Sequence, residues 1–337
     1  MKNLFISAAL LIITLTSCDS NDSDNDMPQT TPEATLFTSS NTSGKITYQN
    51  LLTPSAMVKS FTIASLDAEG ISYNSTSDAV IVASRTNNRL EKYAGIKNAV
   101  SAGTDMLTAT VNSVTGDFTN ARETAISGDF VIVAQDQLAS NGMVNKLFVY
   151  QSTATGFTLT KTFTTDFKLW GIQMIGNDLY AVVDLVGDIV QFKDILNTAS
   201  GNITATKRVT IMGLTRSHGI TYSPTDDVLI LTDVANATSG TDGGLIIIKN
   251  FSTVFASTAA AGTIMMTNQI RVYGPNSLLG NPVDVAYDNV TRNIYVAERL
   301  NAGGEVLTYS YPTSSGDYAP TNIRIEAGVT SVFLLRK

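Results

Sequence analysis

The stretch SHGITYSPTDDVLILTDVANATSGTDGGLIIIKN, residues 217–250, shows the pattern on which most of this chain is built. A short apolar run at 219–222 is followed by a polar turn at 223–226 and by a second apolar run at 228–232. A loop rich in Asn, Ser, Thr and Gly leads to a third run at 245–248. The runs are rich in β-branched residues, which are typical of strands. The stretch therefore predicts three short antiparallel strands.

The same pattern recurs along the chain, at intervals typical of propeller blades. The copies are EGISYNSTSDAVIVASRTNNRLEKYAG (69–95), ETAISGDFVIVAQDQLASNGMVNKLFVY (123–150), WGIQMIGNDLYAVVDLVGDIVQFKD (170–194) and VDVAYDNVTRNIYVAERLNAGGEVLTYSY (283–311). Each unit is accompanied by one more alternating strand, expected at 58–63, 107–111, 157–163, 207–211, 269–273 and 322–325. A unit of four strands is the blade of a β-propeller.

The two ends of the repeat region complement each other. Residues 34–49 (ATLFTSSNTSGKITYQ) match the second and third strands of a unit that lacks a first strand. Residues 330–335 (TSVFLL) match a first strand with nothing after it. Joined, these segments make a sixth blade, which closes the ring and leaves no free sheet edge. We therefore expect an all-β, six-bladed propeller of four-stranded blades over residues 34–337.

Composition agrees with one large all-β domain. Of the 337 residues, 43% are hydrophobic and 15% are charged. Helical periodicity is confined to the first few residues and to 251–262, FSTVFASTAAAG. We interpret 251–262 as an insertion between two strands of the fifth complete unit, forming either a short helix or a mobile loop.

The N-terminus has the pattern of an exported lipoprotein. Residues 1–17 combine Lys2 with a short apolar run, which is typical of a secretory signal. The only cysteine, Cys18, follows directly, so the segment resembles the lipobox of bacterial lipoproteins, in which this cysteine is lipidated. A plain signal peptide with a chance cysteine is the alternative. The resemblance implies a stable membrane anchor, which takes at least two acyl chains.

Residues 18–33 are interpreted as the lipidated cysteine and an acidic, disordered tether. Acidic residues at this place also resemble signals that direct some lipoproteins outward, so we expect a cell-envelope protein, at the outer membrane, on either of its faces; a solvated spacer explains the same residues. The formal charge of −7 argues against nucleic acid as a partner.

Candidate site residues follow from aligning the units. In a propeller, the loops entering the innermost strands and the loops after the second strands open on one face. The side chains expected there before the innermost strands are Glu69, Arg122, Trp170, His218, Val283 and Thr330. Those expected at the ends of the second strands are Ser39, Ser84, Gln135, Asp184, Asp233 and Glu298. We expect Glu69, Arg122, Trp170, His218, Asp184, Asp233 and Glu298 to form a central polar and aromatic pocket. The alternative is that they only satisfy one another around a water-filled channel.

His218, the only histidine, has two interpretations of its own. It is a candidate general base or metal ligand, oriented by Asp184 or Asp233. A structural, hydrogen-bonded histidine is the commoner arrangement. Calcium is a further candidate at the acidic turns on the opposite face, 177–178 and 226–227.

The units resemble the six-bladed propellers of the NHL-repeat and SMP-30/gluconolactonase-like superfamily, whose blades begin with a short glycine-isoleucine strand. Here that start is Gly70-Ile71, Gly171-Ile172 and Gly219-Ile220. The lactonase members are similar in having a metal-binding glutamate where Glu69 stands. They place Asn and Asp at the corresponding points of later blades, where this chain has His218 and Val283.

Two function classes are thus expected. The first is a non-catalytic envelope protein that binds a small molecule, glycan, peptide or partner protein. The second is a lactonase-like hydrolase that uses Glu69, His218 and a metal ion. A propeller fold alone does not choose between them.

Overall fold

Residues 217–250 form three antiparallel strands of one sheet, as their pattern predicts. The apolar runs become β17 (Ile220–Ser223), β18 (Val228–Asp233) and β19 (Gly244–Lys249). Every residue of β18 is buried, because successive side chains point to opposite faces of the sheet and both faces are covered. Leu229 packs into one hydrophobic cluster and Ile230 into another.

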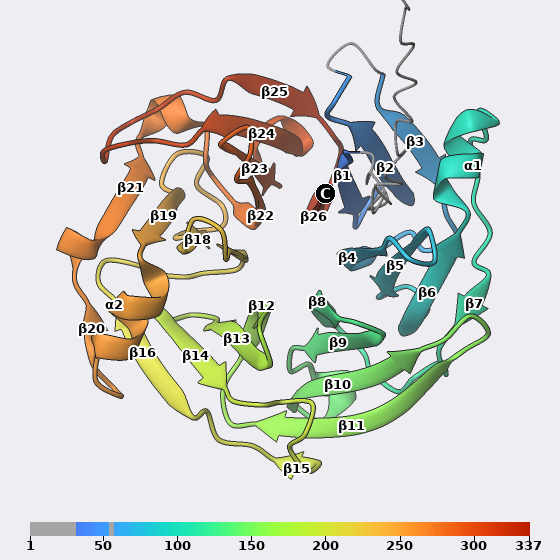
Figure 1. The fold of residues 1–337 in the computed structure, drawn as a ribbon, viewed down its shortest axis with the longest axis horizontal. Helices are drawn as coiled ribbons and strands as arrows, with labels where there is room; N and C mark the ends of the chain where they lie inside the picture. The colour runs from blue at the N-terminus through green and yellow to red at the C-terminus, as the bar shows by residue number, and fades with distance from the viewer. Residues whose placement is uncertain (1–31, 54–56) are drawn as a thin grey trace, which may run out of the picture. The chain divides into compact units, whose positions relative to one another are not determined.

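A computed structural model describes residues 32–53 and 57–337, which form a ring of six sheets (Figure 1). The expected six-bladed propeller is confirmed, with four antiparallel strands to a blade. Blades are numbered in chain order, starting with the one that holds the first strand. Blade 1 consists of β26 (Val329–Arg336), β1 (Ala34–Ser40), β2 (Lys45–Asn50) and β3 (Lys59–Thr62); blade 2 of β4 (Ala68–Asn74), β5 (Ala79–Ser84), β6 (Arg89–Ala94) and β7 (Val111–Asn112); blade 3 of β8 (Ala121–Ser127), β9 (Phe130–Gln135), β10 (Asn145–Ser152) and β11 (Phe157–Thr165).

The second half of the ring repeats this order. Blade 4 consists of β12 (Leu169–Ile175), β13 (Asp178–Val183), β14 (Asp188–Phe192) and β16 (Lys207–Ile211); blade 5 of β17, β18, β19 and β21 (Gln269–Tyr273); blade 6 of β22 (Pro282–Asp288), β23 (Asn293–Glu298), β24 (Glu305–Ser310) and β25 (Asn322–Ile325). The helices are α1 (Ile96–Ser101) and α2 (Phe251–Ser257), with 3-10 turns η1 (Ala139–Asn141), η2 (Met266–Asn268), η3 (Pro275–Ser277) and η4 (Asn301–Gly303).

The hydrophobic core lies between blades. Six clusters of buried side chains are found in the described part of the chain, and each joins two neighbouring blades. Because every sheet is covered on both faces, its strands read as nearly continuous apolar runs.

Ring closure occurs as the ends of the repeat region predict. β26 pairs antiparallel with β1 from Ala34↔Arg336 to Ser39↔Ser331. Beyond the strands, Glu33 and Lys337 exchange backbone hydrogen bonds of 3.2 and 2.9 Å. The chain therefore enters and leaves the propeller at one place.

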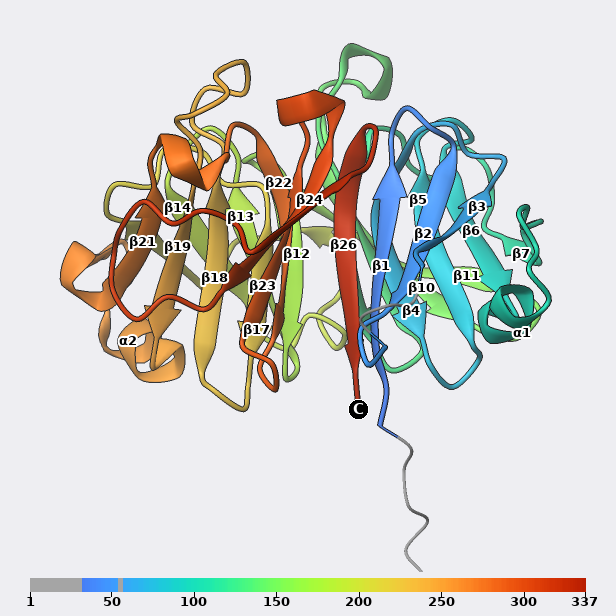
Figure 2. The same ribbon diagram turned by 90° about the horizontal axis from the view of Figure 1, so that it is seen from above.

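That place defines the two faces of the molecule. We call the face at which the six innermost strands begin the upper face, and the face at which they end the lower face (Figure 2). β26 begins at the upper face, so Glu33 and Lys337 lie at the lower face.

Neighbouring innermost strands approach so closely that only glycine fits at some contacts. A Cβ atom on Gly171 would lie 2.2 Å from the His218 carbonyl oxygen, and one on Gly219 would lie 2.7 Å from the Asp284 Cα atom. Real Cβ contacts are longer, so the glycine-isoleucine starts of the repeats are a packing requirement at the axis.

The outer edges of several blades carry a short parallel strand from the next blade. β15 (Gly201–Asn202) pairs with β11, and β20 (Thr263–Ile264) pairs with β16. Met106 makes the same kind of bridge to Thr62, and Gly316 to Val272. These contacts link consecutive blades at the rim.

One expected strand is corrected by this arrangement. Residues 107–111 were expected to form the fourth strand of blade 2, but only Val111–Asn112 pairs there. The backbone N–H of Leu107 donates instead to the Thr62 carbonyl at 2.9 Å. The segment therefore begins against blade 1 and reaches blade 2 only at Thr110, whose backbone N–H donates to the Lys92 carbonyl at 2.8 Å.

The insertion at 251–262 begins with the short helix α2, one of the two expected forms. It lies between β19 and β21, which belong to the fourth complete unit in chain order and not the fifth. Helix α1, of six residues, was not expected from the sequence, because a helix this short shows little periodicity.

The expected signal segment 1–17, Cys18 and most of the tether 18–33 lie outside the described residues. In the described part of the chain, no helix combines the length and the hydropathy needed to cross a membrane.

Candidate functional site

Three of the side chains expected at the upper face, Arg122, Trp170 and His218, stack on one another. The Arg122 guanidinium lies over the Trp170 ring, with 4.0 Å from Cζ to the ring centroid. The Trp170 and His218 rings are parallel within 4°, with centroids 3.5 Å apart. Arg122 lies in β8, Trp170 lies in β12, and His218 lies two residues before β17, so three consecutive blades meet here.

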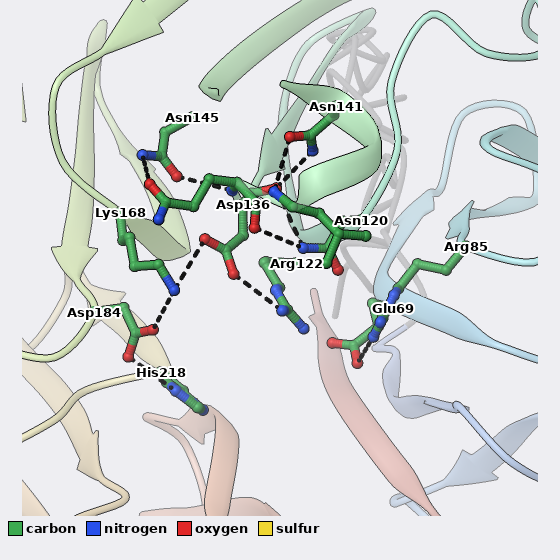
Figure 3. Close-up of polar contacts among 12 residues, drawn as sticks. Glu69, Arg85, Asn120, Arg122, Asp136, Asn141, Asn145, Lys168, Asp184 and His218 are labelled. Atoms are coloured by element: carbon green, nitrogen blue, oxygen red, sulfur yellow. Dashed lines mark hydrogen bonds and ion pairs between the residues drawn. The ribbon is translucent and has the colours of Figure 1, made fainter. Parts of the chain in front are cut away.

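Carboxylates at the ends of the second strands hold this stack in place (Figure 3). The Arg122 Nη2 atom donates to Asp136 Oδ2 at 3.0 Å, and Arg216 Nε donates to Asp184 Oδ1 at 2.7 Å. The Lys168 Nζ atom bridges the same two acids, 3.5 Å from Asp136 and 4.0 Å from Asp184. The cations and acids form one continuous network.

Glu69 lies on the other side of Arg122 and has its own partner. The Arg85 Nη1 atom donates to Glu69 Oε1 at 2.8 Å. Burial raises the pKa of Glu69, although Arg122 and Arg85 act against that rise. Glu69 is therefore an ion-paired, buried acid.

His218 is held as a neutral ring. Burial lowers the pKa of His218 to about 4, and the adjacent Asp184 only partly offsets this effect. The Nε2 atom lies 3.3 Å from Asp184 Oδ1, but neither ring nitrogen has a well-aligned hydrogen-bond partner among the described residues. Its ring is 3% exposed and covered by Trp170, so it offers no open nitrogen to a substrate.

Asp184 keeps its charge beside this neutral ring. Burial tends to raise the pKa of Asp184, but the close contact with His218 and the hydrogen bond from Arg216 outweigh it, so the pKa lies below its usual value. The acid orients Arg216 and anchors the His218 side of the stack.

Charges on the upper face are layered. Arg85, Arg122, Lys168 and Arg216 are 15–27% exposed, whereas three of the acids that pair with them, Glu69, Asp136 and Asp184, are 1–5% exposed; the fourth, Asp67, pairs with Arg85 at 3.6 Å and is 34% exposed. Arg299, which lowers the pKa of both Asp67 and Glu69, is exposed as well. We call the five cations Arg85, Arg122, Lys168, Arg216 and Arg299 the upper rim. Solvent meets positive charge there.

This layering corrects the expectation of an aromatic surface. Trp170 is 9% exposed and packs in the core cluster between blades 4 and 5. Its ring faces are in contact with Arg122 and His218. Trp170 therefore offers no open aromatic surface to a ligand.

Two further candidates bind loop backbone. Glu298 accepts backbone hydrogen bonds from Gly280, Asn281, Leu300 and Asn301. Asp233 accepts from the Thr215, Arg216 and Ala235 backbone N–H groups and from the Tyr273 hydroxyl. Their geometry assigns both acids to loop capping.

Two acids on the axis were missed by the sequence alignment. Glu123 and Asp284 each pair with the next-to-last residue of the second strand in their blade, Ala134 and Ala297, as Glu69 pairs with Ala83. A bulge at the start of each innermost strand shifts the register, so aligning residue by residue selected Arg122 and Val283 instead. In the sequence, each of these acids stands one position after the residue that the alignment selected.

A calcium lactonase site does not fit these residues. Val283 packs in the core between blades 6 and 1, and Glu69 is already ion-paired. Within the described ranges, no cluster of three or more His, Cys, Asp or Glu side chains has a geometry that would hold a metal ion.

The acidic turns on the lower face are occupied by internal contacts as well. Asp226 accepts a hydrogen bond from the Tyr287 hydroxyl at 2.6 Å, and Asp227 accepts from Tyr222 and Ser252. Asp178 accepts from Gln191. These carboxylates act as turn and side-chain acceptors.

Comparison with known proteins identifies the fold. No protein-family profile and no curated protein matches this sequence. A chain of a nidogen/laminin complex is similar with a TM-score of 0.61 at 12% identity, covering 89% of this chain and 98% of that chain. A chain of Kuenenia stuttgartiensis hydrazine synthase is similar with a TM-score of 0.52 at 14% identity, covering 81% of this chain and 73% of that one. At these identities the likeness shows that this chain has a β-propeller fold, and nothing about its ligand.

Proposed function

We propose that this chain is a lipid-anchored cell-envelope protein whose propeller binds an anionic ligand at the upper rim. The ligand class is an acidic glycan, or a peptide or protein segment that carries carboxylates. The single observation that carries the proposal is the exposure of five cations above the buried acids in a chain of net charge −7.

The acids beneath the rim offset the repulsion among its cations and hold them in position for an anionic ligand. Asp136 and Asp184 fix the guanidinium groups of Arg122 and Arg216 from below, which leaves outward N–H groups for a ligand. Arginine presents a planar set of donors that matches a carboxylate. Preorganised side chains also lose little conformational entropy on binding.

Orientation supports the same proposal. The chain enters the propeller at Glu33 on the lower face. An anchor at Cys18 would hold the lower face toward the membrane and leave the upper rim facing away from it. A rim in this position can meet a soluble or surface-bound partner.

Two resemblances bear on the partner. We propose a distant relation to NHL-repeat and SMP-30-like propellers, supported by the glycine-isoleucine starts such as Gly219-Ile220. One similar propeller chain comes from a complex of two proteins, nidogen and laminin, so an acidic protein segment belongs among the ligands to test. No observation favours the lactonase alternative.

Binding should depend on rim cations and on salt. We expect the full chain, probed on an array of glycans and peptides, to retain acidic members and to ignore neutral ones. Lys168 makes only long contacts and Arg299 is exposed, so the double variant Lys168→Gln/Arg299→Gln should fold normally. Each lost cation should weaken binding about tenfold, or about 1.4 kcal/mol. Higher ionic strength should weaken it further.

The matched control is Lys249→Gln, an exposed lysine at the lower end of β19. Its affinity should equal that of the unaltered chain. Retention of neutral glycans, or equal affinity in the rim variant, would contradict the proposal.

A further inference from the structure

We propose that the lower face holds a second site, a cavity on the propeller axis that binds a small primary ammonium ion at Glu123 and Asp284. The cavity has a volume of 230 Å³ and is bordered by all six innermost strands, from their middle to their lower ends. Glu123 and Asp284 line its inner end. The lining begins at Glu123, directly after the rim residue Arg122, and continues toward the lower face; the proposal does not rest on the function proposed for the rim.

The two acids come from opposite sides of the ring. Glu123 belongs to blade 3 and Asp284 to blade 6. The Ser331 hydroxyl of blade 1 donates to Glu123 Oε2 at 3.4 Å, although blades 1 and 3 are not neighbours. Such a contact requires the Glu123 carboxyl to reach the axis.

Neither carboxylate has an ion pair among the described residues. Asp284 accepts hydrogen bonds from the Val285 and Val332 backbone N–H groups, both at 2.8 Å. Glu123 accepts from the Thr124 backbone N–H at 2.7 Å, and its other oxygen has only the long Ser331 contact. Among the other buried acids, Asp184 and Glu69 have cationic partners, whereas Glu298 and Asp233 are each held by three or more backbone N–H groups. Buried charges are normally paired, so a counter-charge is missing here.

A proton supplies that charge when no cation is bound. Burial raises the pKa of Asp284 to about 7. Burial, chiefly, and the nearby Asp284 and Glu69 raise the pKa of Glu123 well above its usual value, and Glu69 also adds to the rise for Asp284. A bound cation would replace the proton, so binding should release protons and strengthen as the pH rises.

The lining favours a hydrogen-bond donor. Each innermost strand pairs on one side only, so its other edge presents backbone groups to the axis. Carbonyls and carboxylates accept the three N–H groups of an ammonium ion. The Thr124 hydroxyl, more than nine-tenths buried in a residue that lines the cavity, has no hydrogen-bond partner among the described residues.

Size limits the ligand. A volume of 230 Å³ corresponds to roughly seven or eight waters at about 30 Å³ each. A chain of about five carbons fits, beside aliphatic residues such as Ile71, Ile172 and Ile220. The occupant is therefore a short alkylammonium ion.

The test is calorimetric titration of the full chain with n-pentylammonium chloride at pH 6, 7 and 8. We expect saturable binding that strengthens at least tenfold from pH 6 to pH 8. In buffers of different ionisation enthalpy, the heats should reveal proton release. The neutral 1-pentanol and the anionic pentanoate should not compete.

Variants locate the site. Glu123→Gln and Asp284→Asn should each weaken n-pentylammonium binding at least tenfold at pH 8 and abolish proton release. Glu305→Gln alters a buried acid of β24 that has no ion pair within the described ranges, and this variant should bind as the unaltered chain does. The wild-type titration stands even if one axis variant fails to fold.

Several results would overturn the proposal. They are the absence of saturable binding, equal binding of 1-pentanol, pH-independent affinity, and full affinity in a folded Glu123→Gln variant. Stoichiometric competition by calcium chloride would also overturn it, because the site would then select an inorganic cation.

Discussion

Replacing Trp170 with alanine lowers the free energy of unfolding by about 3–5 kcal/mol, the usual loss for a large buried aromatic side chain. Trp170 is 9% exposed and belongs to the cluster between blades 4 and 5. Its removal also takes away the ring that separates Arg122 from His218. Two buried polar groups then lose their apolar neighbour. Equilibrium urea unfolding of the full chain measures the change.

Two control variants test whether the loss of stability comes from the buried position of the Trp170 ring. Trp170→Phe keeps an aromatic ring and should lose less than half as much. Tyr318→Ala removes an aromatic ring that is 37% exposed, and should stay within about 0.5 kcal/mol of the unaltered chain. A loss below 1 kcal/mol for Trp170→Ala would mean that this ring is not a structural part of the network.

The second large effect is a pH dependence of the free energy of unfolding that arises from protonation of Asp284. The pKa of Asp284 is raised to about 7 in the folded chain, chiefly by burial, from an unfolded value near 4. The folded state therefore holds a proton that the unfolded state has released. The stabilisation is complete below about pH 4 and is lost as the pH rises through about 7.

Asp284→Asn should remove this dependence. Relative to the unaltered chain, the variant should gain on the order of 2–4 kcal/mol between pH 4 and pH 8. His218 acts in the opposite direction, because its pKa in the folded chain is lowered to about 4. As the pH falls below about 6.5, the unfolded chain takes up a proton at His218 that the folded chain does not, so the folded state loses stability. Taking the difference between two chains cancels the His218 contribution.

Urea unfolding at each pH gives the two curves. Asp129→Asn, which alters an exposed acid in the β8–β9 turn, is the matched control and should run parallel to the unaltered chain. Parallel curves for Asp284→Asn would show that this carboxyl is not held protonated.

The fold was predictable because each blade repeats one local pattern. The apolar runs at 219–222, 228–232 and 245–248 carry the strand signal without help from distant residues. Ring closure was predictable for the same reason, since 330–335 supplied the strand that 34–49 lacked. The fourth strand of blade 2 was misplaced because its segment pairs with blade 1, a contact that no local pattern encodes.

Sequence reasoning predicted the site residues only where the position of a residue in the repeat places it at the upper face. Arg122, Trp170 and His218 were expected together and do meet. Whether a ring is open or covered depends on three-dimensional packing, so the burial of Trp170 could not be read from its position. The same holds for Lys168 and Arg216, whose role depends on carboxylates from two neighbouring blades.

Glu123 and Asp284 escaped prediction because of backbone geometry. A bulge moves each acid one residue past the aligned position. Burial raises the pKa of both acids, with a further contribution from Glu69 and, for Glu123, from Asp284 across the axis, and only the closed ring brings these groups together.

The central claim is that the upper rim binds an anion. The most direct test is an experimental structure of the full chain with the acidic glycan or peptide that the array selects. We expect a ligand carboxylate within hydrogen-bond distance of at least two rim cations among Arg122, Lys168 and Arg216. A ligand seated elsewhere, with the upper rim in contact only with solvent, would contradict it.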